Sequence, residues 1–438
     1  MSDRRRLSGN VAALTLLQLL TYAAPLITVP FLARVLGPTE YGVLCFAQSV
    51  TLHLDFLTDY GFALTSTRSI AVARDRPEEI ARVFWTTLAA KSLIMSVCAV
   101  ILLLAVGAMP KLYAARWLYA GCFLSVIGSG IFPVWFFQGI ERMTIFAAAF
   151  GVARLITIPL LLLFVLHPDH AARAAAIQGS VEIVSTLIVI PVLWRHVGWR
   201  QPRTRDVLDS LRQAWPLFVS SSALFLCTSS TPVILGITAG AVNVGLYSAA
   251  DKLIKAAIAA LNPLSQALYP HIAAQRTLSP RSAIGIIRGS LAISACLGLG
   301  LSAAIFTLAG PMCRLVFGPS FSASAELLRY LAPLPTLFAL MNVLGTQTMV
   351  VFGMDAAMSR IMLRCAAVGI SLTLVLSVFF GARGAAVASV TTVASMLVLM
   401  ARSIKARGIP VFGPAPKNSL EWNLSLQSVE EVRCASRD

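Results

Sequence analysis

The chain has 438 residues, of which 57% are hydrophobic and 12% are charged. A soluble globular protein carries roughly 25% charged residues, so this composition excludes an ordinary water-soluble domain. The net charge of +16 would suggest nucleic-acid binding in a soluble protein, but here the basic residues fall between apolar segments, as they do in the loops of membrane proteins. The sequence therefore predicts an all-α polytopic membrane protein that has no nucleic-acid partner.

Twelve apolar segments follow one another, each near the length of about 20 residues that a membrane-spanning helix needs. They cover residues 11–34, 41–65, 83–109, 114–137, 145–166, 175–194, 214–238, 243–270, 285–309, 324–352, 360–380 and 384–404. The basic N-terminus imitates a signal peptide, but the apolar run continues to Leu36, so we expect an uncleaved first span. The connections are short and leave no room for a soluble catalytic domain, which favours a transporter over an enzyme.

The loop charges predict the orientation of these spans. Of the Lys and Arg residues in the loops, in the tails or near the ends of the spans, 24 lie on the side that holds both termini and 6 on the other side. Basic loops stay in the cytoplasm, so both termini are expected there.

The chain divides into four predicted parts. Residues 1–194 and 214–407 each contain six spans, residues 195–213 link them, and residues 408–438 form a polar tail that we expect to be disordered. The link is rich in Arg and carries apolar residues at helical spacing, namely Val207, Leu208 and Leu211. We therefore expect a helix that lies on the membrane surface and is attracted to anionic lipids.

The two six-span parts share a faint repeat. Displaced by 203 residues, "LGPTEYGVLCFAQSV" (36–50) matches "AGAVNVGLYSAADKL" (239–253), with Gly37 over Gly240 and Gly42 over Gly245. Each stretch joins an odd-numbered span to the next at the start of its half. Because each half has an even number of spans, the halves run in the same direction and form parallel repeats around a central cavity.

Proline and glycine mark the predicted bends of these segments. Proline kinks a helix, and the freed carbonyl groups need protein or a wet cavity beside them. The expected hinge and turn residues are Pro25, Gly37, Pro38, Pro232 and Gly240.

Three stretches resemble a known family: "PFLARVLGPTEYG" (30–42), "PVWFFQGIERM" (133–143) and "GLYSAADKLIKAAIAALNPLSQALYP" (245–270). They are similar to the Wzx-type polysaccharide flippases of the multidrug/oligosaccharidyl-lipid/polysaccharide exporter superfamily, and the resemblance covers about residues 10 to 405. It implies twelve helices in two bundles around a cavity. It also implies a bacterial inner-membrane protein that flips an undecaprenyl-diphosphate-linked oligosaccharide from the cytoplasmic to the periplasmic leaflet, for O-antigen, lipopolysaccharide or exopolysaccharide synthesis. The implied partners are this substrate, membrane lipids and the polysaccharide polymerase or export machinery.

Charged residues inside the spans are candidate functional groups, because each costs roughly 2.5–3.5 kcal/mol at a helix centre. A diphosphate needs cationic donors while it crosses the membrane, so the predicted substrate ligands are Arg154, Lys252, Lys255 and Lys91. The alternative is that these side chains form structural ion pairs, namely Asp251–Lys255, Lys91–Asp55 and Arg154–Glu182.

The energy source has no ATP signature, since GxxxxGK[ST] is absent. Buried carboxylates can titrate near neutral pH, which makes Asp55, Asp59, Glu182 and Asp251 the candidates for coupling to H⁺ or Na⁺. No other cofactor is expected. The eight cysteines form no CxxC pair and predict no metal site.

Two rival functions, a multidrug exporter and a membrane enzyme, are less consistent with the sequence. A multidrug exporter of the same superfamily would favour an acidic cavity for organic cations, whereas here bases match or exceed acids inside the spans. A polymerase or ligase would need a large periplasmic loop, and the predicted periplasmic loops are all short.

Trp135, Phe136 and Phe137 are expected to form a membrane-interface belt, with a sugar-stacking platform as the alternative.

Overall fold

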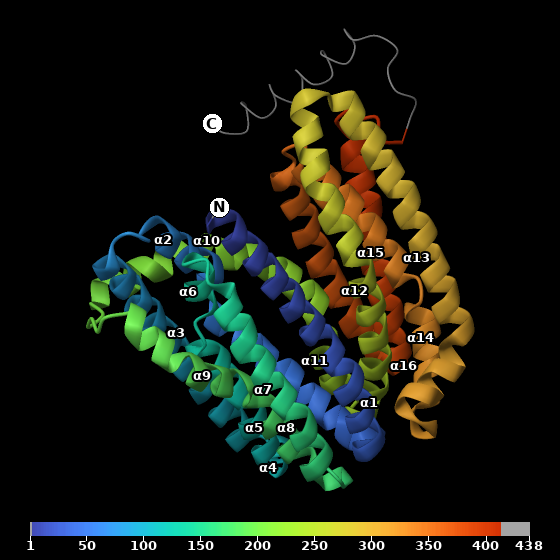
Figure 1. The fold of residues 1–438 in the computed structure, drawn as a ribbon. Coiled ribbons are helices and arrows are strands. Elements are labelled where there is room, and N and C mark those ends of the chain that lie inside the picture. Colours follow the sequence, from blue (N-terminus) through green and yellow to red (C-terminus); the bar gives the residue numbers. More distant parts are fainter. Residues whose placement is uncertain (1, 413–438) are drawn as a thin grey trace. The chain divides into compact units, whose positions relative to one another are not determined.

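The computed structural model describes residues 2–412, with side chains from Ala24 onward except at positions 223, 224, 227, 264, 266, 267, 277 and 280. Within this range every regular element is a helix, which confirms the predicted all-α class (Figure 1). Most of the predicted tail, from residue 413 onward, lies outside the described residues.

The chain forms two compact units. The first comprises Met1–Phe225, Pro232–Ala249 and Arg314–Phe321, and the second comprises Leu226–Thr231, Ala250–Cys313 and Ser322–Asp438. The predicted boundaries at residues 194 and 214 stay a prediction. The first unit includes Pro232–Ala249, which contains the second copy of the repeated turn, although this segment follows residue 214 in the sequence.

The first unit is built on the N-terminal helices. They are α1 (Ser2–Asp59), α2 (Phe62–Val72), α3 (Pro77–Ala108), α4 (Pro110–Ala114), α5 (Arg116–Ile131), α6 (Val134–Gly139), α7 (Met143–Phe164), α8 (Ala171–Gly179), α9 (Val181–His196), most of α10 (Thr204–Ser229) and most of α11 (Thr231–Thr238). Helix α1 packs against α5 and α7, and α5 packs against α8.

The second unit is built on the C-terminal helices. They are most of α12 (Ala241–Leu278), most of α13 (Pro280–Phe317), α14 (Ser324–Leu331), α15 (Leu334–Asn342), the π-helical segment Val343–Val350 and α16 (Asp355–Ala406). Helices α14 and α15 and the π-helical segment pack against α16.

Seven helical stretches in the described residues are long and apolar enough to span a membrane. They are Pro77–Ala108, Arg116–Gly139, Met143–Phe164, Pro168–His196, Arg281–Phe317, Ser324–Val350 and Asp355–Ala406. The chain is therefore a multi-pass membrane protein. The count of twelve spans in two repeats stays a prediction, although α16 contains two of the predicted segments, separated at Gly381 (φ 57°).

The span predicted at residues 41–65 is interrupted, which corrects its predicted continuity. Tyr60 (φ 48°) and Gly61 (φ 81°) separate α1 from α2. A Cβ atom on Gly61 would lie 3.2 Å from the carbonyl oxygen of Ala214 on α10. The break therefore follows from the left-handed backbone and from the close approach of a helix distant in sequence.

The aromatic run at residues 135–137 is buried, so the prediction of a membrane-interface belt is wrong. Trp135 is 3% exposed and both Phe136 and Phe137 are 0% exposed, in a cluster with Phe84 and Phe146. The physical reason is the packing of α6 against α2, which encloses the rings in protein.

The link between the predicted halves contains a helix, as the sequence predicted, because residues 204–213 belong to α10. Its position on the membrane surface stays a prediction. Val207 and Leu211 pack against Phe62, Ala90 and Ala214. Two of the three apolar side chains at helical spacing therefore pack against the protein. Leu208 is 49% exposed.

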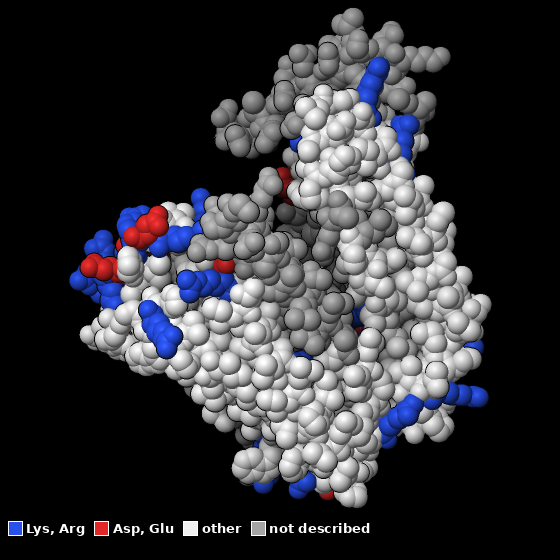
Figure 2. Space-filling model, in the orientation of Figure 1, with Lys and Arg blue, Asp and Glu red and all other residues white. Residues whose placement is uncertain are grey.

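Charged side chains gather at the end of the first unit that carries α2 and the start of α3 (Figure 2). There Arg74 pairs with Glu141 at 2.9 Å, and Arg82 pairs with Glu79. The loop charges predict that this end of the first unit lies in the cytoplasm, and this orientation stays a prediction.

Candidate functional site

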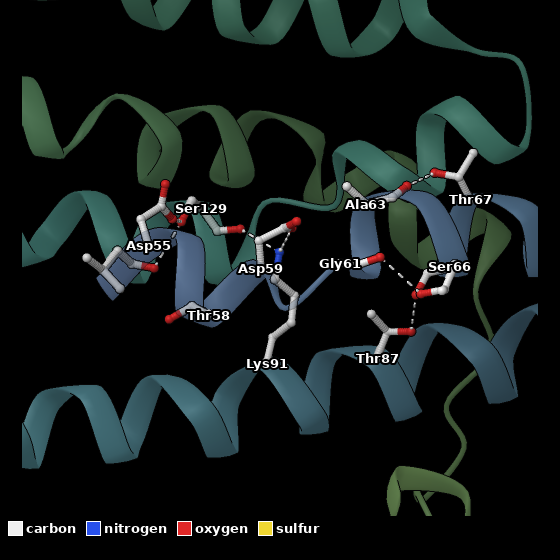
Figure 3. A network of polar contacts seen from close by, with 12 residues as sticks. Asp55, Thr58, Asp59, Gly61, Ala63, Ser66, Thr67, Thr87, Lys91 and Ser129 are labelled. Atoms are coloured by element: carbon white, nitrogen blue, oxygen red, sulfur yellow. Dashed lines mark hydrogen bonds and ion pairs between the residues drawn. The ribbon is translucent and has the colours of Figure 1, made fainter. Parts of the chain in front are cut away.

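A polar network joins three helices inside the first unit (Figure 3). Lys91 on α3 places its Nζ 3.3 Å from Asp59 Oδ1 on α1 and donates a hydrogen bond of 3.3 Å to the Ser129 carbonyl oxygen on α5. The Ser129 hydroxyl donates to Asp55. The Lys91 side chain is only 5% exposed and Asp59 is 38% exposed, so the lysine is buried and its charge is paired.

Glycines allow the helices of this network to approach closely. A Cβ on Gly128 would lie 2.7 Å from the Cβ of Glu182, and one on Gly130 would lie 3.1 Å from Met95 Sδ. The sequence Gly128-Ser129-Gly130 thus places α5 against α9 and α3. Ser129 was not among the predicted site residues, and its position between two glycines inside a span is the signal that could have found it.

The partner of Lys91 differs from the predicted ion pair. The sequence paired Lys91 with Asp55, whereas the structure pairs it with Asp59, one helical turn further along α1. Asp59 is the last residue of α1 before the Tyr60–Gly61 break, and Asp55 accepts the Ser129 hydroxyl instead.

Arg154 lies midway along α7, and its guanidinium group is incompletely bonded. Its Nε is buried without a hydrogen-bond partner. Among the described residues no carboxylate comes within ion-pair distance of Arg154, although Glu182, in the first turn of α9, is close enough to interact electrostatically with both Arg154 and Asp55. A buried donor without an acceptor is costly, so the geometry leaves Arg154 available to an anion.

The basic pair of the second unit is held differently. On α12, Lys255 Nζ lies 2.7 Å from Asp251 Oδ2, which is the i,i+4 pair that the sequence predicted. The Lys255 side chain is 58% exposed and the Asp251 side chain 16% exposed. Lys252 is partly buried on the same helix. An exposed ammonium keeps donors free for a second partner.

The predicted site residues therefore fall into two sets. The first unit brings together Asp55, Asp59, Lys91, Arg154 and Glu182, and the second unit holds Asp251, Lys252 and Lys255. A single cavity lined by both sets stays a prediction. No group of three or more His, Cys, Asp or Glu side chains in the described part of the chain is placed to hold a metal ion.

A second polar contact missed by the sequence-based predictions joins α1 and α8. Gln48 Nε2 donates to Gln178 Oε1 at 2.6 Å. Gln48 is the residue that the repeat aligns with Asp251. The repeat thus places a neutral amide in one unit where the other unit has a carboxylate.

The predicted hinge residues take different conformations. Gly37 (φ 70°, ψ 172°) interrupts α1, Pro38 begins the next helical stretch, and Gly240 (φ 83°) precedes α12. Pro232 is the second residue of α11, where a missing N–H costs nothing. Pro25 lies within the first stretch of α1, whose backbone is helical there.

The chain is similar in sequence to proteins of polysaccharide biosynthesis. A family model described as "Polysaccharide biosynthesis protein" matches residues 7–275. A protein of Escherichia coli (strain K12) named "Putative O-antigen transporter" is 30% identical over 411 residues, which cover 92% of this chain and 99% of that protein. A protein of the same name from Shigella dysenteriae is 28% identical and covers 90% of this chain and 99% of that protein.

Solved structures resemble the fold at low sequence identity. The inward closed conformation of the lipid II flippase MurJ superposes with a TM-score of 0.71 at 11% identity, over 90% of this chain and 87% of that one. An inward-facing multidrug resistance MATE transporter of the MOP superfamily gives a TM-score of 0.59 at 17% identity, over 96% of this chain and 99% of that one. At these identities the likeness concerns the fold.

Proposed function

The chain belongs to the polysaccharide biosynthesis protein family, and from this premise we propose that it is a transporter, not an enzyme, that flips a lipid-linked oligosaccharide across the membrane. The relatives named O-antigen transporters support this function, and the fold of the lipid II flippase MurJ is compatible with it. We propose an undecaprenyl-diphosphate carrier, movement from the cytoplasmic to the periplasmic leaflet of the bacterial inner membrane, and cytoplasmic termini.

The single observation that carries this proposal is the state of Arg154. An intramembrane guanidinium whose Nε has no partner suits a phosphate, which accepts charge-assisted hydrogen bonds from the planar guanidinium group. Lys252 and Lys255 of the second unit are further proposed ligands, because they carry positive charge on an apolar helix. Lys91 is a weaker candidate, because Asp59 and the Ser129 carbonyl already occupy its ammonium group.

The arrangement of acids in the first unit supports a role in energy coupling. Asp55 and Glu182 interact electrostatically in the same region as Arg154. When two carboxylates lie in one low-dielectric site, the negative charge of one disfavours ionisation of the other. Binding H⁺ or Na⁺ at Asp55, Asp59 or Glu182, or at Asp251 in the second unit, would therefore change the charge that Arg154 and the lysines present to the substrate.

The first test measures transport directly. The purified protein, reconstituted in liposomes, is expected to make a fluorescent undecaprenyl-diphosphate-linked oligosaccharide accessible to an impermeant quencher from both leaflets. Protein-free liposomes should leave the inner-leaflet pool protected. If the protein transports ethidium and leaves the lipid-linked probe unflipped, the rival function, multidrug export, is correct and the flippase proposal fails.

The second part of this test concerns the supply of substrate. Deleting the gene in its host should stop surface polysaccharide synthesis and cause lipid-linked oligosaccharide to accumulate in the inner leaflet. The polymerase or export machinery that uses the flipped product would then lack substrate. Normal surface polysaccharide in the deletion strain would contradict the proposal.

A further inference from the structure

Six aromatic rings lie in a row within the first unit, between the C-terminal part of α1, with the adjoining Tyr60, and α10. The two segments contribute rings alternately, in the order His53, Phe225, Phe56, Phe218, Tyr60 and Trp215. The centroids of neighbouring rings lie between 4.1 and 6.1 Å apart, which is close to the spacing of favourable aromatic pairs. We call these six residues the aromatic ladder.

The aromatic ladder belongs to the surface of the unit. All six rings are at least partly exposed, and Trp215 is 52% exposed. The aromatic run at residues 135–137 differs, because its rings are at most 3% exposed. The ladder can therefore contact a ligand, whereas the buried run cannot.

Polar groups accompany the aromatic ladder on both segments. The ladder contains the imidazole of His53 and ends beside Asp59, whose side chain is 38% exposed. On α10, Ser221 is exposed and Ser222 is partly exposed, and both lie in the stretch between the last two rings of that helix. Charged and hydroxyl groups are costly against hydrocarbon, so this surface is poorly suited to a lipid chain.

We propose that the aromatic ladder is the subsite that binds the sugar residues of the lipid-linked substrate. This inference rests on the proposed flippase function. A pyranose ring carries C–H groups on its faces and hydroxyl groups around its rim, so it fits apolar rings that are accompanied by hydrogen-bonding groups. The aromatic rings contact the C–H groups of the sugar, and Asp59 accepts hydrogen bonds from its hydroxyl groups. Arg154, in the same unit, is left to the diphosphate.

Protection of an engineered cysteine tests the sugar subsite. Ser221→Cys, in a functional background without native cysteines and in detergent, is expected to react with a water-soluble maleimide, because Ser221 is exposed. The undecaprenyl-diphosphate-linked oligosaccharide should slow this labelling roughly tenfold, and undecaprenyl diphosphate without sugar should leave the rate unchanged. The matched control is Ser322→Cys, an exposed serine before α14, whose labelling should be the same with either lipid.

The outcomes separate this inference from the proposed function. If the cysteine-free parent flips no lipid-linked oligosaccharide, the proposed function fails. If the parent flips and the oligosaccharide does not slow the labelling of Ser221→Cys, or the sugar-free lipid slows it equally, the function stands and the sugar subsite is wrong. Failure of the substrate-free protein to react with the maleimide would show that detergent or lipid covers this surface, which also overturns the subsite.

Removal of single rings tests the same subsite by transport kinetics. Trp215→Leu and Tyr60→Leu should each raise the KM for the lipid-linked oligosaccharide roughly tenfold and leave kcat nearly unchanged, because the lost contact contributes to binding. Trp215→Phe and Tyr60→Phe keep a ring and should remain near the wild-type KM. The control is Trp117→Leu, which removes a 72% exposed ring on α5. A wild-type KM in both leucine variants would overturn the subsite.

Discussion

Replacing Arg154 by Gln is expected to reduce flipping of the lipid-linked oligosaccharide roughly 10- to 100-fold. A hydrogen bond to a charged group contributes about 1.5–3 kcal/mol, and each 1.4 kcal/mol is about a factor of ten. The uncharged amide leaves the diphosphate without its guanidinium partner in the membrane. The reconstituted liposome assay measures the rate, and the amount of folded protein in the membrane is measured in parallel.

Three further variants distinguish a substrate ligand from a structural ion pair. Arg154→Lys should retain part of the activity, because it keeps the charge and loses the planar geometry. Arg116→Gln is the control, since Arg116 is a surface arginine beside Tyr113 on the neighbouring α4. If Glu182→Gln restores the activity of Arg154→Gln, Arg154 serves to neutralise Glu182, and the substrate-ligand interpretation is wrong.

The helical class could be predicted from sequence because it depends on local composition. Long apolar runs satisfy their backbone hydrogen bonds internally only as helices, and the described helices overlap all twelve predicted segments. The interruption at Tyr60 and Gly61 could not be predicted in the same way. Tyrosine rarely adopts φ of 48°, and its conformation here depends on Phe218 and other residues of α10, more than 150 positions away.

Burial of the aromatic run shows the same dependence on distant residues. The run at residues 135–137 is aromatic, as a membrane-interface belt is. Its sequence alone does not show whether the rings contact lipid or a neighbouring helix. A Cβ atom on Gly139 would lie 2.7 Å from Ile70 Cγ2 of α2, so the missing side chain lets α2 approach closely. That contact encloses the rings.

The candidate site residues of the first unit were individually predictable, but the partner of Lys91 was not, whereas the local i,i+4 pair Asp251–Lys255 was predicted correctly. Charged side chains are rare in apolar segments, so Asp55, Asp59 and Lys91 stand out by residue type alone. Both acids lie on one face of α1, one turn apart, and either could reach Lys91. The choice depends on Ser129, a neutral residue on another helix that hydrogen-bonds Asp55.

The Asp59–Lys91 pair predicts an asymmetric effect on stability. Asp59→Asn leaves a lysine with a 5% exposed side chain without its counter-ion, and breaking a buried ion pair costs about 3–5 kcal/mol. Lys91→Met leaves Asp59, which is 38% exposed and reached by water, so its cost should be nearer 1 kcal/mol. Thermal unfolding of the purified variants in detergent should therefore show a much lower midpoint for Asp59→Asn than for Lys91→Met.

The double variant Asp59→Asn with Lys91→Met provides the decisive comparison. Removing both charges eliminates the unpaired ammonium group, and replacing a whole buried pair is often neutral for stability. We therefore expect the double variant to unfold near the temperature of Lys91→Met, well above Asp59→Asn alone. If the pair is structural, flipping should recover together with stability. Recovery of stability without flipping would instead make Lys91 or Asp59 a direct participant in transport, as a substrate ligand or a coupling carboxylate.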